Sequence, residues 1–231
     1  MKPTLSRRVF AEFLGTAFLV AAVIGSGIMA DHLAGGNVAL ALLANTIATG
    51  AVLVALILTF CSISGGHFNP AVSLADAIEH RLTWSDAASY LAAQCSGGIL
   101  GAVAAHVMFG FSFISLSRHS RSGSAQLFSE FVATFGLLSV ILGCSKLHAA
   151  MVPFAVGAYI TAAYWFTAST SFANPAVTIA RSLSDTFAGI RPVDVPGFLG
   201  AQFVGATVAV ILFRWLIPRE RSSDVVPIQS K

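Results

Sequence analysis

The chain has 231 residues, of which 56% are hydrophobic and only 10% are charged. Average soluble domains carry about 25% charged residues, so a chain of this composition cannot keep its apolar surface away from water and must lie in a lipid bilayer. The net charge of +3 and the pI near 9.0 do not indicate nucleic-acid binding, because the basic residues fall between apolar runs rather than on one face.

Six apolar segments follow one another along the chain, each with about the 20 residues that a helix needs to cross a bilayer. We expect all six to be helices, because the hydrocarbon core offers no partner to an unpaired backbone group. The first lacks a convincing cleavage site and is predicted to be a true span rather than a signal peptide. In chain order the expected spans are 9–30, 38–60, 85–109, 125–144, 149–168 and 195–217.

The distribution of Lys and Arg predicts the orientation of these spans. With both termini on one side, nine basic residues lie on that side and four on the other. The nine are Lys2, Arg7, Arg8, Arg81, Lys146, Arg214, Arg219, Arg221 and Lys231, and the four are Arg118, Arg121, Arg181 and Arg191. Because cytoplasmic segments carry the excess of basic residues, we expect cytoplasmic termini in the inner (plasma) membrane, with 221–231 as a cytoplasmic tail.

Two shorter apolar segments, 70–79 and 175–184, are too short to cross the bilayer and are typical of re-entrant pieces. They belong to an internal repeat, since HFNPAVSLADAI around Asn69 recurs as SFANPAVTIARSL around Asn174. Three spans per half is an odd number, so the second half must insert upside down and the short segments enter from opposite faces. The sequence therefore predicts one domain built from inverted repeats, 1–115 and 125–220.

The repeated motif is Asn-Pro-Ala, formed by Asn69, Pro70 and Ala71 and by Asn174, Pro175 and Ala176. Proline suits the first turn of a helix, which leaves each asparagine at the N-cap. Two half-helices that meet at their N-termini would direct their positive dipole ends at one point, repel cations there and offer amide N–H groups to a solute oxygen. A single Asn-Pro could be an ordinary turn, but two copies in matching places indicate a common function.

With these motifs the chain resembles the major intrinsic protein family, which includes the aquaporins. The resemblance covers nearly all of 9–217 and includes Glu12, Thr16, SGGHFNPAV at 64–72, Glu130, Thr134 and FANPAV at 172–177. It implies an all-α membrane protein, an aquaporin-like bundle of six transmembrane helices plus two re-entrant half-helices. It also implies a homotetramer with one pore per subunit, which passes small neutral solutes and is neither an enzyme nor dependent on a cofactor.

The resemblance also implies supporting roles for three residues near the motifs. Glu12 and Glu130 occupy equivalent places and would brace the buried backbone of the re-entrant loops, although a hydrated carboxylate at a helix N-terminus is the alternative. His67 resembles the family's loop histidine, for which we predict a structural hydrogen-bonding role rather than gating. The cysteines Cys61, Cys95 and Cys144 lack metal-ligand spacing, so we predict no metal site.

In this family the narrowest point of the pore uses four positions, which a gapless count from the two motifs assigns to Thr49, Ala162, Ser171 and Val177. Most members carry an arginine where this chain has Val177. Valine removes a fixed charge and hydrogen-bond donors and widens the opening. Arg181 follows one helical turn later and could share the face of Val177, but we favour a role in satisfying nearby carbonyl groups.

Small, mildly polar side chains at these positions predict poor discrimination by size among neutral solutes. The stretch 164–181 is similar to bacterial channels of this family that are encoded with arsenic-resistance genes, which favours arsenite and methylated trivalent arsenicals, with glycerol and some water, as permeants. The alternative is a water or glycerol facilitator in osmotic or carbon metabolism. A proton-coupled transporter would need titratable groups along its path, and only Glu12 and Glu130 are candidates.

Overall fold

The computed structural model describes residues 3–217, which form helices joined by loops. Six helices are long and apolar enough to cross a membrane, so the predicted all-α membrane fold is confirmed. They are α1 (Leu5–Leu33), α2 (Val38–Ser64), α4 (Trp84–Met108), α5 (Ser124–Leu147), α6 (Val152–Phe166) and α8 (Val195–Leu216), the last two counted together with the 3-10 turns that precede them. Short 3-10 turns, η1 (Ala149–Met151) and η2 (Pro192–Asp194), lead into α6 and α8.

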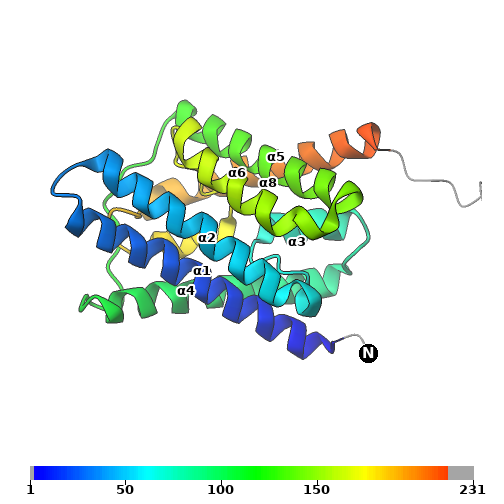
Figure 1. Cartoon of the computed structure of the whole chain (residues 1–231), viewed down its shortest axis with the longest axis horizontal. Helices are drawn as coiled ribbons and strands as arrows, with labels where there is room; N and C mark the ends of the chain where they lie inside the picture. The colour runs from blue at the N-terminus through cyan, green and yellow to red at the C-terminus, as the bar shows by residue number, and fades with distance from the viewer. Residues whose placement is uncertain (1–2, 218–231) are drawn as a thin grey trace, which may run out of the picture.

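Each expected span coincides with one of these helices to within a few residues at its ends. The start of α1 and the end of α8 lie at the same end of the molecule, which we call the near end, and the loop between α1 and α2 lies at the opposite, far end (Figure 1). The predicted tail 221–231 and four of the basic residues counted above lie outside the described residues. Those four are Lys2, Arg219, Arg221 and Lys231.

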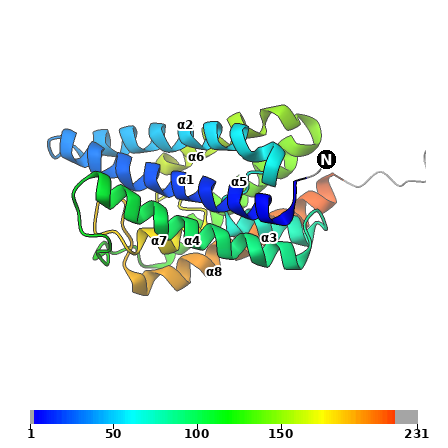
Figure 2. The ribbon, with the colours of Figure 1, turned by 90° about the horizontal axis from the view of Figure 1, so that it is seen from below.

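Two short helices lie inside the bundle, α3 (Pro70–Ile78) toward the near end and α7 (Pro175–Arg181) toward the far end (Figure 2). Each has proline in its first turn and an asparagine N-cap whose side-chain oxygen accepts a hydrogen bond from the backbone of the first turn. Proline has no backbone N–H to leave unpaired there, and the cap satisfies one of the remaining donors. The Asn-Pro-Ala sequence therefore fixes where each short helix begins.

Glycines let the long helices pack closely in matching pairs, α1 with α4 and α5 with α8. A Cβ on Gly97 would clash with the carbonyl oxygen of Phe13, and a Cβ on Gly205 would clash with that of Phe131. Small residues at helix crossings are typical of membrane proteins, because apolar lipid gives little hydrophobic drive for helix association and van der Waals contact must replace it. The two halves of the chain use the same device at corresponding crossings.

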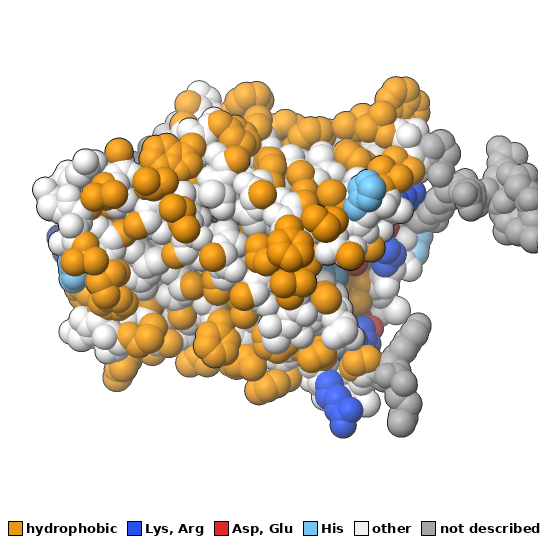
Figure 3. Space-filling view, viewed as in Figure 1, with side chains coloured by type: hydrophobic (Ala, Val, Ile, Leu, Met, Phe, Trp, Pro, Cys, Tyr) orange, Lys and Arg blue, Asp and Glu red, His pale blue; other side chains and the backbone are white. Residues whose placement is uncertain are grey.

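The outer surface is apolar, and the polar side chains of the spans are turned inward. Large hydrophobic side chains cover much of the visible face, while basic side chains gather mainly toward the near end (Figure 3). Exposed examples include Phe10, Phe18, Phe128, Trp165 and Trp215. By contrast Glu12, Gln94, Glu130 and Gln202 are fully buried. Such a distribution suits a lipid environment with a polar interior.

Candidate functional site

A cavity of about 380 Å³ lies among the long helices and the tips of α3 and α7. One side of its lining is aliphatic and comes mainly from α1, α2, α5 and α6, and the other includes the loops that precede the two short helices. Toward the near end its lining residues include Asp76, Arg81, Ser145 and Lys146. Toward the far end they include Thr49, Tyr164, Ser171, Phe172, Val177 and Arg181. The cavity therefore passes between the two Asn-Pro-Ala motifs.

The two motif asparagines are held in place by reciprocal hydrogen bonds. The Asn69 amide nitrogen donates to the Ala173 carbonyl oxygen, and the Asn174 amide nitrogen donates to the Phe68 carbonyl oxygen, both at 2.8 Å. A primary amide has two N–H donors, so each asparagine keeps a second one. Because both asparagines line the cavity, these donors can meet a solute oxygen at the point where the short helices converge.

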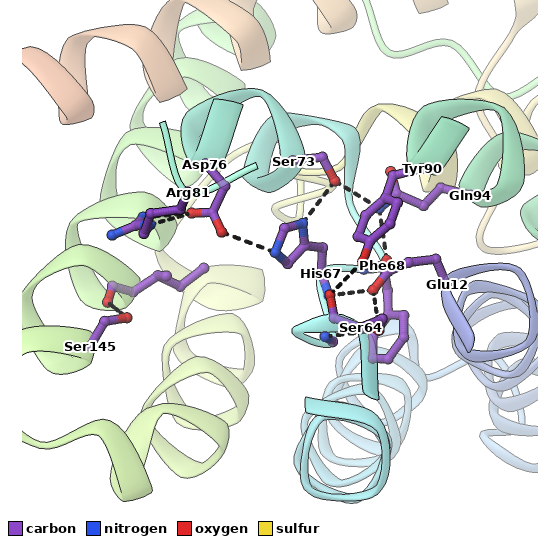
Figure 4. Close-up of polar contacts among 12 residues, drawn as sticks. Glu12, Ser64, His67, Phe68, Ser73, Asp76, Arg81, Tyr90, Gln94 and Ser145 are labelled. Atoms are coloured by element: carbon purple, nitrogen blue, oxygen red, sulfur yellow. Dashed lines mark hydrogen bonds and ion pairs between the residues drawn. The ribbon is translucent and has the colours of Figure 1, made fainter. Parts of the chain in front are cut away.

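Glu12 extends from α1 toward the loop before α3 and binds its backbone (Figure 4). Its Oε1 accepts hydrogen bonds from the Ser64 hydroxyl at 2.6 Å and the His67 backbone N–H at 3.0 Å. Its Oε2 accepts from the Phe68 backbone N–H at 2.6 Å and the Gln94 amide at 2.8 Å. A buried carboxylate with four donors is well compensated, and it satisfies backbone groups that no helix reaches.

Glu130 does the same for the loop before α7. It accepts from the backbone N–H groups of Phe172 at 2.8 Å and Ala173 at 2.9 Å, and from the Gln202 amide at 2.6 Å. Both glutamates are therefore bound into the protein rather than hydrated at a helix end. Neither carboxylate is among the residues that line the cavity.

Two glutamines complete the braces, and the sequence reasoning missed both. Gln94 also donates to the Ser73 hydroxyl, and Gln202 also donates to the Thr178 hydroxyl, each at 2.9 Å. Each glutamine lies in the third long helix of its half, and each hydroxyl lies in the short helix. A comparison of the two repeats beyond the Asn-Pro-Ala segments is the signal that could have found them.

The braced loops hold a backbone conformation that ordinary residues rarely adopt. Phe68 and Ala173, which directly precede the two asparagines, have φ values of +49° and +48°. Thr170 and Ser171 are also at positive φ, at +60° and +47°, where the first loop has glycine. Residues in this region persist only when their surroundings fix them, which is what the two glutamates do.

His67 links the near-end loop to α3 (Figure 4). Its Nδ1 lies 3.0 Å from the Ser73 hydroxyl, and its Nε2 lies 3.1 Å from Asp76 Oδ2. Asp76 in turn accepts from Arg81 at 2.5 Å. Both ring nitrogens thus have protein partners, and the contacts match the structural role predicted for this histidine.

In the second half, Phe172 occupies the position that corresponds to His67. The guanidinium groups of Arg181 and Arg121 lie over its ring. The Arg181 guanidinium carbon lies 3.4 Å from the ring centroid, and that of Arg121 lies 4.9 Å from it. Arg121 also donates to the carbonyl oxygens of Gly189 and Ser169 at 2.8 and 3.0 Å. Burial lowers the pKa of Arg121 to about 10, which still leaves it charged at neutral pH.

Of the four predicted filter positions, Thr49, Ser171 and Val177 line the cavity, whereas Ala162 does not. Ala162 is exposed on the outside of α6, and Tyr164 stands in the lining instead, with its hydroxyl 3.2 Å from Thr49 Oγ1. The physical reason is helix phase, since two residues along an α-helix rotate a side chain by about 200°. The gapless count was therefore wrong on α6.

The cavity face of α6 is set by its four-residue periodicity. Its lining residues are Val152, Val156, Ile160 and Tyr164. Side chains spaced by four lie on one face of a helix, so this series identifies Tyr164 without a count from the motifs. In the described part of the chain no group of three or more His, Cys, Asp or Glu could hold a metal ion, and none of the three cysteines is among the lining residues.

Sequence comparison finds a family model and related proteins that match this chain. The family model described as "Major intrinsic protein" matches residues 1–148. The chain is 56% identical to Aquaglyceroporin AqpS of Rhizobium meliloti (strain 1021) over 217 residues, which cover 94% of this chain and 93% of that protein. It is 30% identical to Aquaporin Z of Brucella melitensis over 229 residues, or 92% and 99% of the two chains.

A solved structure has the same overall fold. The X-ray structure of the aquaglyceroporin from Plasmodium falciparum matches with a TM-score of 0.74, covering 93% of this chain and 98% of that one at 24% identity. At that identity the match concerns the fold alone.

Proposed function

Because the chain belongs to the major intrinsic protein family, we propose that it is a passive channel with a broad range of small uncharged permeants. The family consists of channels for small neutral solutes, so the chain is not an enzyme. Within that class we assign arsenous acid and methylated trivalent arsenicals as its substrates, together with glycerol and some water.

One observation carries the broad selectivity. The residue directly after the second Asn-Pro-Ala is Val177, and its side chain lines the cavity with no charge or hydrogen-bond donor to offer. The neighbouring lining groups Thr49 and Ser171 are short as well. Three short side chains beside the larger Tyr164 leave room for solutes the size of a triol or a metalloid acid.

The arsenic assignment rests on the resemblance of residues 164–181 to channels encoded with arsenic-resistance genes. It is supported by 56% identity to a protein named as an aquaglyceroporin. Arsenous acid is uncharged at neutral pH and resembles a small polyol in shape, so a pore for glycerol has suitable dimensions for it.

The test is flux through purified protein in liposomes, with water, glycerol and arsenous acid compared under the same gradient. We expect all three to pass. Rapid water flux with no glycerol or arsenous acid flux would contradict the broad range and would favour a water channel of osmotic function. Glycerol flux without arsenous acid flux would favour a facilitator of carbon metabolism.

Val177→Arg tests the assigned filter position. The new side chain narrows the opening and adds donors, so glycerol and arsenous acid flux should fall by about tenfold relative to water. Val177→Leu is the matched control, because it adds bulk without charge and should have the smaller effect. Unchanged relative fluxes in Val177→Arg would show that the filter lies elsewhere.

The channel is further proposed to be a homotetramer of the inner (plasma) membrane with cytoplasmic termini. The basic side chains at the near end support this orientation through the positive-inside rule. A membrane-impermeant thiol reagent applied to intact cells should label a cysteine introduced at Gly35, between α1 and α2, and should not label one at Lys146. Cross-linking in the membrane should give a ladder that ends at four subunits.

A further inference from the structure

The far end of the cavity holds polar groups that the roles assigned so far do not use. Arg181 is the last residue of α7 and is 2% exposed, yet it lines the cavity. Its Nε donates to the Ala188 carbonyl oxygen, which fixes the guanidinium group in the plane that covers the Phe172 ring. From the sequence we expected Arg181 to donate to nearby carbonyl groups. In the structure only its Nε does so.

The rest of the guanidinium group is available to a solute. Arginine has five N–H donors, and one of them is taken by Ala188. Among residues 3–217 the bond from Nε to Ala188 is the one hydrogen bond of the Arg181 side chain, so its two terminal nitrogens have no acceptor there. Because the side chain is part of the cavity lining, these donors are directed to whatever passes through it.

Ser171 gives a second, independent sign of a binding site. Its side chain is 2% exposed, and its Oγ is buried without a hydrogen-bond partner among the described residues. Ser171 also lines the cavity, and its backbone is held by a hydrogen bond from its own N–H to the Ser169 hydroxyl at 3.2 Å. A buried hydroxyl without a partner costs free energy unless a ligand supplies one.

The platform beneath Arg181 is rigid. The backbone N–H of Phe172 is held by Glu130, and its ring packs edge-on against Phe198 with centroids 5.2 Å apart. Arg121 lies over the same ring and is anchored to two carbonyl oxygens. Glu130 is occupied by its own donors, and Asp194 accepts from the Arg121 backbone and pairs with Arg191. The guanidinium groups of Arg121 and Arg181 therefore leave a fixed positive charge at the far end of the cavity.

We propose that Arg181 and Ser171 form the solute-recognition site at the far end of the pore, in which Arg181 supplies, one helical turn beyond Val177, the positive charge that excludes cations. The site takes small neutral solutes rich in hydroxyl oxygens, which accept from the guanidinium group and exchange a hydrogen bond with Ser171. This inference deepens the proposed function and rests on it. An uncharged residue directly after the motif is thereby compatible with exclusion of cations, because the charge lies one turn further along α7.

Urea and guanidinium test the charge, because the two permeants are planar and similar in size, and urea is neutral whereas guanidinium carries one positive charge. In liposomes the wild-type channel should pass urea and exclude guanidinium. Arg181→Gln should raise the guanidinium-to-urea flux ratio by about tenfold, since a unit charge at this range contributes on that order. Arg181→Lys retains the charge and should keep the wild-type ratio.

Arg118→Gln is the matched control, because it removes an exposed arginine of the far-end loop that does not line the cavity. Its flux ratio should equal that of the wild type. A rise as large as that of Arg181→Gln would overturn the proposal, because the effect would then be one of general surface charge. An unchanged ratio in Arg181→Gln would overturn it too.

Ser171→Ala is the second variant and remains decisive if Arg181→Gln does not assemble. It should lower glycerol flux relative to urea flux by severalfold. The substitution removes the Ser171 hydroxyl, which can both donate a hydrogen bond to a glycerol hydroxyl and accept one from it. An unchanged glycerol-to-urea ratio would contradict the recognition site. Failure of the wild-type channel to pass any of these neutral solutes would refute the proposed function itself, independently of Arg181.

Discussion

The two halves of the chain share their support and differ at their ends. Each half has an asparagine cap, a buried glutamate beneath the loop, and a glutamine that joins the glutamate to a hydroxyl of the short helix. Seven positions after Asn69 stands Asp76, while seven positions after Asn174 stands Arg181. Equivalent places thus carry opposite charges at the near and far ends.

The residue two positions before each asparagine differs in the same way. His67 Nε2 in the first half lies 3.1 Å from Asp76 Oδ2, and the Phe172 ring in the second half is covered by Arg181. Hydrogen bonds to the backbone recur in both halves because both loops have the same strained conformation to hold. We infer that the shared residues specify the fold and that the differing residues specify which solutes pass.

The largest effect should come from removing either brace. Glu130→Gln keeps the size of the side chain but turns one acceptor into a donor that faces the N–H groups of Phe172 and Ala173. We expect a loss of about 3 kcal/mol or more of stability, because buried donors lose a charged acceptor. A lower apparent melting temperature in detergent, with loss of monodisperse protein, would measure it.

Glu12→Gln should have an effect of similar size if the two braces are equivalent. Asp31→Asn is a suitable control, since it makes the same chemical change on an exposed side chain near the end of α1. If both glutamate variants have the same melting temperature as Asp31→Asn, the glutamates do not hold the loops. Other residues that the two halves share must then do so.

A smaller effect is expected at the close helix crossings. In Gly205→Ala the added methyl group meets the Phe131 carbonyl oxygen, which belongs to the backbone and cannot rotate away. Overpacking of this kind costs about 1–3 kcal/mol. Gly97→Ala should behave alike, because its Cβ would meet the Phe13 carbonyl oxygen at the corresponding crossing.

Gly200 offers a control in the same helix as Gly205, because nothing lies within 4 Å of the position of its Cβ. Gly200→Ala should be neutral or raise the melting temperature slightly, since alanine favours a helix by about 1 kcal/mol over glycine. A Gly205→Ala variant as stable as Gly200→Ala would show that α5 and α8 can separate without loss.

Repetition made most of the fold predictable from sequence. The six spans follow from hydropathy, and the two short helices follow from proline and asparagine, whose local chemistry fixes a helix start. The glutamates could be found because they recur with the motif. Each of these features is encoded near the residues that show it.

The parts that escaped prediction depend on helix phase or on long-range contacts. Ala162 was assigned by a count that assumes no shift between α6 and the second motif, and the helix places Tyr164 in the cavity instead. Gln94 and Gln202 look like ordinary polar residues in apolar spans until their glutamate partners are seen. Arg181 was expected to satisfy carbonyls, and only the cavity lining reveals its free donors.

The smallest effect concerns residues 110–123, which join α4 to α5 and so link the two halves. This link lies along the segment after α7 through backbone hydrogen bonds from Ser115 to Leu183 and from Ser117 to Ser182, both 3.0 Å long, and from Arg191 to the His119 carbonyl at 2.8 Å. The strength of this contact should depend weakly on pH through His119.

The pKa of His119 lies below its ordinary value, first because of partial burial and then because of the charges of Arg121 and Arg181, which outweigh the opposite influence of Asp185. A histidine with a lowered pKa binds its proton more readily when the link is detached, so acidification below about pH 6.5 favours detachment, and the contact is strongest above that value. Amide hydrogen exchange at Ser115, Ser117 and Arg191, corrected for intrinsic rates, should show less protection at pH 5 than at pH 7.5, by less than about tenfold. His119→Gln should abolish the difference. If it persists in that variant, a titratable group other than His119 controls the link.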